Sequence, residues 1–117
     1  MWMSSVPADA PVSACVCYVT AGSPEEARSL SRTLVAERLA AGANILNGMT
    51  SLYWWQGKLE QAEETMVLLK TRSELVPALT ERVKQLHSYE CPGVVALSIS
   101  DGNSDYLSWI ESETRSP

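Results

Sequence analysis

The chain has 117 residues, a hydrophobic content of 45%, and 14 acidic against 9 basic side chains, which gives a formal net charge of −5. A chain of this length is expected to form one domain. The acidic balance disfavours nucleic acids and anionic membrane surfaces as partners, because both reward clustered lysine and arginine. No stretch approaches the ~18 apolar residues that a membrane-spanning helix needs.

The three cysteines are Cys15, Cys17 and Cys91, an odd number, and the first residues lack the basic start and apolar run of a secretory signal. Both features favour a reduced, cytoplasmic protein with buried thiols. Residues 1–11 are small, proline-containing and aperiodic. They predict a flexible N-terminal tail before a single domain over residues 12–115.

The first structured elements are a strand and a helix. Residues 12–20 form a near-continuous apolar run, typical of a strand that is covered on both faces. Ser23, Pro24 and Glu26 then provide an N-cap, a first helical residue and a capping box. Apolar residues follow at helical spacing, and Gly42 is a suitable C-terminal stop. The pattern predicts a helix over about residues 24–41.

Residues 44–71 carry the most informative pattern, two long strands joined by a tight turn at residues 56–58. Arms of about a dozen residues span roughly 40 Å, whereas a compact domain of this size has a radius of gyration of about 13–14 Å. The tip carries Tyr53, Trp54 and Trp55, which water would not favour leaving bare. We therefore expect another copy of the chain to cover this hairpin.

The remaining pattern completes the fold. A second helix is expected to begin at Ser73 or slightly later, since Pro77 suits a first turn, and to end near His87. Residues 93–100 predict a fourth strand, and Tyr106 and Ile110 mark a short C-terminal helix. The order β-α-β-β-α-β plus a helix predicts an α+β, ferredoxin-like sandwich whose helices cover one face of an antiparallel sheet. A partner subunit should cover the other face.

Several short segments occur in a fixed order: residues 40–46, 50–60, 69–71, 75–79, 87–92 and 105–110. Together they resemble the CutA divalent-cation tolerance family over about residues 12–112. The resemblance implies a PII-like homotrimer of ferredoxin-like units, with Tyr53, Trp54 and Trp55 at the trimer interface. It also implies a role in tolerance of divalent metals, copper especially.

The chain departs from the family at two places. The usual His-Pro-Tyr-Glu-Val-Pro signature is His-Ser-Tyr-Glu-Cys-Pro here, at residues 87–92. Some bacterial members bind copper through a cysteine on the first strand and two consecutive histidines. By resemblance these positions fall on Val19, Leu86 and His87, so only the last is retained. Cys17 lies two residues before Val19 and would share its strand face.

The candidate metal ligands are His87, Cys17 and Glu90, with copper or another divalent cation as an optional ligand rather than an obligatory cofactor. Two plainer interpretations stand beside this one. Cys15 and Cys17 suit small buried residues of a packed strand, and a spacing of ~7 Å is wide for two thiolates on one metal. His87 suits a helix C-terminus, where it caps free carbonyls.

The candidate cleft residues are aromatic or charged: Trp54, Lys58, Glu60, Lys70 and Tyr89. In the functional interpretation they line a cleft between subunits that binds a cation or a small ligand, with Lys70 suited to an anionic group. In the plainer interpretation the turn is solvated and the aromatic residues are interface anchors. Glu60, Glu63 and Glu64 form an acidic group that is typical of a solvated face.

Catalysis finds little support, because no nucleophile elbow or phosphate-binding loop is present. The enzymatic alternative is a thiol pair of Cys91 and His87, but Cys91 precedes Pro92 and is therefore held in extended backbone. We expect a non-enzymatic binding protein. The alternative is a structural interaction or signalling hub with no intrinsic metal role.

Overall fold

The computed structural model describes residues 13–117. Its elements are β1 (Ala14–Ala21), α1 (Pro24–Ala36), β2 (Gly42–Trp55), β3 (Lys58–Arg72), α2 (Val76–Leu86), β4 (Val94–Ser98) and α3 (Ser104–Glu113), with a 3-10 turn (Ser73–Leu75) before α2. The tail predicted at 1–11 and the first residue of the strand predicted at 12–20 lie outside the described residues.

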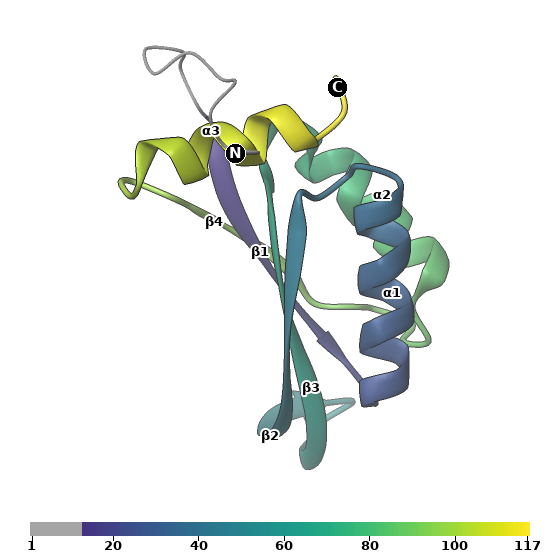
Figure 1. Ribbon diagram of the computed structural model, residues 1–117. Coiled ribbons are helices and arrows are strands. Elements are labelled where there is room, and N and C mark those ends of the chain that lie inside the picture. The colour runs from purple at the N-terminus through teal and green to yellow at the C-terminus, as the bar shows by residue number, and fades with distance from the viewer. Residues whose placement is uncertain (1–12) are drawn as a thin grey trace.

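The strands form one antiparallel sheet in the order β2-β3-β1-β4, with α1 and α2 on one face (Figure 1). This is the strand order of the ferredoxin-like sandwich, so the predicted α+β fold is confirmed. The third helix, α3, lies at the end of the sheet away from the β2-β3 turn. Within the described part of the chain, no helix has the length and apolar character to cross a membrane.

The core lies between the sheet and the two covering helices. Alternate residues of β1, among them Cys15, Cys17 and Val19, are buried on the helix-covered face. Leu30 and Leu34 of α1 pack into the same cluster. The two first-strand thiols are therefore small core residues, as the plainer interpretation of this apolar run holds.

The first helix ends at Ala36, not near residue 41 as the sequence predicts. The chain turns at Arg38, whose φ of 59° lies in the left-handed region. The N–H of Leu39 donates to the carbonyl of Leu34 at 3.0 Å, and the N–H of Arg38 bonds the carbonyl three residues earlier at 3.0 Å. These two bonds form a Schellman motif. Glycine usually fills the left-handed position, so the sequence pattern favoured Gly42, which instead begins β2.

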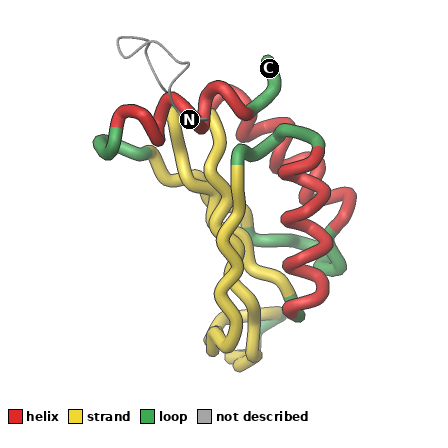
Figure 2. The backbone as a smooth tube through the Cα atoms, in the orientation of Figure 1, coloured by secondary structure: helices red, strands yellow, loops and turns green. Residues whose placement is uncertain are grey.

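The long hairpin is present, and it projects past the helices (Figure 2). Its turn has two central residues, Gln56 and Gly57, with φ of 51° and 80°, where the sequence predicts three. Positive φ at both positions is the mark of a type I′ turn, which suits the twist of paired strands. A bulge at residues 47–48 shifts the register once. The projecting hairpin makes the molecule elongated, with extents of 50 × 25 × 23 Å.

The sheet face opposite α1 and α2 exposes apolar side chains among the described residues. Val16 and Tyr18 alternate with the buried residues of β1 and so point away from the helices. Leu97 and Val95 of β4 are paired with them and are exposed. Apolar patches of this kind are typical of interaction surfaces.

Candidate ligand-binding pocket

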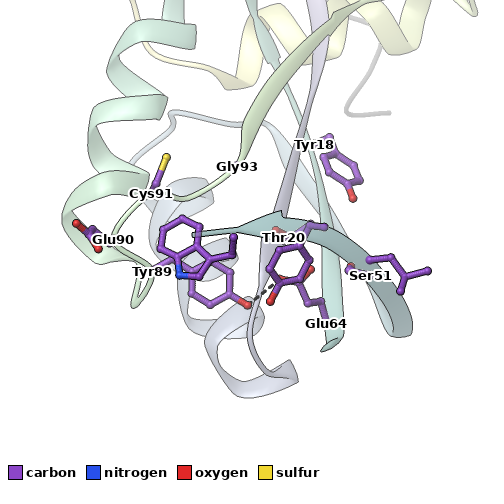
Figure 3. A pocket seen from close by; sticks show the side chains of 11 residues that line it. Tyr18, Thr20, Ser51, Glu64, Tyr89, Glu90, Cys91 and Gly93 are labelled. Carbon is purple, nitrogen blue, oxygen red and sulfur yellow. Dashed lines mark hydrogen bonds between the residues drawn. The ribbon is translucent and has the colours of Figure 1, made fainter. Parts of the chain in front are cut away.

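A pocket of about 580 Å³ lies between the outer half of the hairpin and the loop that joins α2 to β4, residues 87–93 (Figure 3). Strand β1 ends at the pocket, β2 and β3 supply one wall, and the loop supplies the other. The lining residues are Tyr18, Thr20, Ser51, Leu52, Tyr53, Trp55, Glu64, Tyr89, Glu90, Cys91 and Gly93.

His87 fixes the start of this loop. Its Nε2 lies 2.7 Å from the carbonyl oxygen of Thr20, and its Nδ1 accepts a hydrogen bond from the N–H of Tyr89 at 3.0 Å. Because a carbonyl can only accept, these partners place the ring proton on Nε2. The His87 side chain is fully buried. Its ring bonds β1 rather than the carbonyls of its own helix, so the predicted carbonyl-capping role is wrong.

Glu26 holds the same loop from the other side. Its Oε2 accepts the N–H of Ser88 at 2.8 Å, and its Oε1 accepts the N–H of Gly22 at 3.1 Å. Partial burial acts to raise the pKa of Glu26, but the bonds from Ser88 and Gly22 outweigh it and the pKa lies below its ordinary value. The Ser23 side chain caps the N–H of Glu26 at 3.1 Å, as predicted, while the carboxylate serves the loop instead of closing the capping box.

Tyr89 crosses the pocket to Glu64, as Figure 3 shows. Its hydroxyl donates to Oε2 of Glu64 at 2.7 Å, and its ring lies 4.6 Å from the ring of His87. Burial, followed by the bond to the carboxylate, raises the pKa of Tyr89, so the phenol stays protonated. Glu64 is only 8% exposed, so its expected place on a solvated face is wrong.

Gly22 allows the Tyr89 side chain to pass close to the backbone at the end of β1. A Cβ atom at Gly22 would lie 3.3 Å from the hydroxyl oxygen of Tyr89, closer than most real Cβ contacts. Its backbone N–H is also one of the two amide donors to Glu26. The residue therefore serves the site through its lack of a side chain and through its amide.

The predicted metal ligands do not converge within one chain. Cys17 is buried on the helix-covered face, and the neighbouring thiol of Cys15, followed by burial, raises the pKa of Cys17. Both ring nitrogens of His87 already have partners. Glu90 lines the pocket, but its side chain points away from the Tyr89–Glu64 pair (Figure 3). Among residues 13–117, no group of three His, Cys, Asp or Glu side chains is placed to hold a metal ion.

Of the predicted cleft residues, only Tyr89 lines this pocket. Tyr89 lines the pocket, and so do Tyr53 and Trp55, which were expected at a subunit interface. The candidates outside its wall are Trp54, Lys58, Glu60 and Lys70. Lys70 lies six residues along β3 from Glu64, roughly 20 Å away at the usual rise per residue. There its ammonium donates to the side chain of Asn44, and burial lowers the pKa of Lys70.

Sequence reasoning missed most of the pocket wall. The lining residues that were not among the predicted metal, cleft or interface residues are Tyr18, Thr20, Ser51, Leu52, Glu64, Cys91 and Gly93. One signal for Glu64 was available, because it shares strand parity with Met66 and Leu68 on the open face. That position next to two apolar residues of the same face could have marked Glu64 as more buried than Glu60 or Glu63.

Residues 15–113 match the family described as CutA1 divalent ion tolerance protein. The chain belongs to this family. The resemblance inferred from the short segments is therefore confirmed. The names attached to the family and to its bacterial members describe tolerance of divalent cations, and they describe no reaction.

Individual CutA proteins are similar to this chain along most of its length. The divalent-cation tolerance protein CutA of Thermus thermophilus is 46% identical over 99 residues, covering 85% of this chain and 96% of that protein. The chloroplastic protein CutA 1 of Oryza sativa is 43% identical over 104 residues, covering 89% of this chain but only 59% of that protein's length. The crystal structure of CutA1 from Oryza sativa matches with a TM-score of 0.88 at 42% identity, covering 91% of this chain and 97% of that one.

Proposed function

We propose that this chain acts in divalent-cation tolerance as a homotrimeric binding protein that takes a cation or a small ligand in clefts between its subunits. The observation that carries the proposal is the projecting hairpin, whose large apolar side chains are left exposed by residues 13–117. Trp54 is 73% exposed, and Leu59, its cross-strand partner, is 62% exposed. Leaving such surfaces in water is unfavourable, and a neighbouring subunit would bury them.

The position of the pocket supports a ligand site at the seam. It opens beside the hairpin, and Tyr53 and Trp55 belong to both the hairpin tip and the pocket wall. A neighbour that packs on the hairpin would therefore meet the pocket and restrict its access to water. Charged ligands bind more strongly in such a partly desolvated site than in open water.

Copper titration tests the metal part of the proposal. Calorimetry of the purified protein with copper is expected to give saturable heat, reduced in Glu90→Gln, which removes a pocket carboxylate. His87→Ala is the companion variant, with its fold checked by circular dichroism because His87 holds the loop. Heat that is equal in the parent and in both variants would remove His87 and Glu90 as ligands.

The alternative function is a structural interaction or signalling hub with no metal role of its own. It is favoured by the lack of a three-ligand group among residues 13–117. Under this alternative the protein gives no copper heat, and its partners bind equally with and without a metal chelator. The cytoplasmic location expected from the sequence stays a prediction.

A further inference from the structure

Among residues 13–117, the wall of the pocket carries negative charge and no positive charge. Its carboxylates are those of Glu64 and Glu90, and no lysine, arginine or histidine of the described residues lines it. Anionic ligands such as phosphate esters would meet repulsion here, and Lys70, the predicted anion contact, lies far along β3. The pocket therefore selects for positive or neutral ligands.

Glu64 has no positive partner. It is only 8% exposed, and no lysine, arginine or histidine nitrogen within residues 13–117 lies within 4.0 Å of its carboxylate. Its one described hydrogen bond is the 2.7 Å contact from the hydroxyl of Tyr89. A nearly buried carboxylate with a single neutral donor is poorly compensated, so a cation that entered the pocket would gain a strong electrostatic contact.

The rest of the wall is aromatic. The rings that line the pocket are those of Tyr18, Tyr53, Trp55 and Tyr89, with the aliphatic side chain of Leu52 beside them. The faces of such rings attract ammonium groups, and the attraction is stronger when the site is shielded from water. Aromatic rings do not ligate hard divalent metals, which need several oxygen or nitrogen donors. Ring walls around one buried carboxylate therefore fit an organic cation better than a metal ion.

We propose that this pocket binds a small organic ammonium ion, with its charged nitrogen at the Glu64 carboxylate and its apolar body against the aromatic wall. The proposal rests on the binding function proposed above, and it names the ligand class of the same site. A volume of about 580 Å³ accommodates such a molecule, since ligand sites commonly measure ~300–1,000 Å³.

Three probes of nearly the same size test the charge preference. They are 2-phenylethylammonium, 2-phenylethanol and phenylacetate, which are positive, neutral and negative at neutral pH. In calorimetric titrations of the full chain, the ammonium ion is expected to bind at least about tenfold more tightly than the alcohol, and phenylacetate more weakly than both. Equal binding of the ammonium ion and the alcohol, tighter binding of phenylacetate, or no binding of any probe would overturn the proposal.

Substitutions at two adjacent positions test whether the Glu64 carboxylate is the group that attracts the ammonium ion. Glu64→Gln removes the charge but keeps an acceptor for Tyr89, and it is expected to abolish the tenfold preference for the ammonium ion while the alcohol still binds. Glu63→Gln is the matched control, because Glu63 is exposed, lies outside the pocket wall and makes the same change in net charge. A preference that survives in Glu64→Gln as fully as in Glu63→Gln would contradict the assignment.

Sedimentation of the same samples separates the ammonium-binding proposal from the proposed function as a homotrimer with clefts between its subunits. A trimer that binds copper but shows no charge preference among the probes would overturn only the ammonium assignment. A 12.8 kDa monomer that prefers the ammonium ion would overturn the trimer with its seam clefts and keep the assignment.

Discussion

Glu26 connects three parts of the site. Its carboxylate accepts hydrogen bonds from the N–H of Gly22 before α1 and from the N–H of Ser88 in the loop, and it lies 3.8 Å from Nδ1 of His87. His87 and Ser88 directly precede Tyr89, so the contacts that Glu26 makes with them help to position the Tyr89 side chain. A carboxylate that accepts amide hydrogen bonds is stabilised in its ionised form.

This connection predicts a pH dependence of stability. The folded-state pKa of Glu26 lies below its usual value of 4.5, so the unfolded chain binds the proton more readily. The stabilisation is complete above the usual value and is lost as pH falls through the folded value. Urea unfolding midpoints of the parent are therefore expected to fall more steeply in this acid range than those of Glu26→Gln.

Glu25→Gln is the matched control for this measurement. Its carboxylate is largely exposed, and its described partner is Arg28 at 3.7 Å on the helix surface. Surface pairs of this kind contribute little. Glu25→Gln should keep the acid slope of the parent, and the same slope in both variants would show that Glu26 does not carry it. All midpoints should be compared at one protein concentration, because assembly would shift them.

At the scale of the element, the type I′ turn determines how β2 and β3 pair. Gln56 adopts a φ of 51°, which glycine and asparagine tolerate better than other residues. Gly57 adopts a φ of 80° with open space around it, so its need for glycine is conformational rather than steric. The turn therefore contains one well-suited residue and one poorly suited one.

Two substitutions test this difference. Gln56→Asn places a residue that favours the turn and is expected to stabilise the protein by about 0.5 kcal/mol, whereas Gly57→Ala forces a left-handed alanine and should destabilise it by about 1 kcal/mol. Urea unfolding at a fixed protein concentration measures both. Because both side chains lie at an exposed tip, equal midpoints for all three proteins would show that the tip frays before global unfolding.

How much of the fold the sequence predicts depends on whether the signal is local. Alternation and turn residues predicted the hairpin and the fourth strand, because each depends on near neighbours in the chain. The end of α1 was missed because a Schellman turn with Arg38 at its left-handed position gives no glycine signal. The Tyr89–Glu64 contact joins residues 25 positions apart. No local pattern encodes such a contact, so the pocket required the tertiary structure.

At the scale of the whole molecule, large apolar side chains are exposed both on the open sheet face and at the hairpin tip. Leu97 on β4, Leu46 on β2 and Trp54 near the turn are all exposed, although each is a large apolar side chain. Monomeric proteins rarely expose large contiguous apolar patches, whereas subunits of obligate assemblies leave apolar residues for the interface. The elongated outline, 50 Å along its longest axis, places the hairpin tip beyond the subunit's own core.

Trp54→Ala separates folding from assembly. In one chain the indole is 73% exposed, so its removal should change the stability of an isolated subunit by no more than about 0.5 kcal/mol. If a neighbour buries it, truncation should weaken association by about 2–4 kcal/mol. Sedimentation at nanomolar protein concentration is expected to show dissociation of the variant while the parent stays trimeric.

Arg28→Ala is the control for this variant, because Arg28 is exposed on α1 and is not part of the hairpin. It should assemble like the parent. Far-ultraviolet circular dichroism should be alike for all three proteins at a concentration where each is assembled. A Trp54→Ala protein that keeps its trimer mass through the nanomolar range would contradict the claim that this side chain anchors the subunit interface, because removing a buried indole leaves a cavity that the remaining contacts would have to offset.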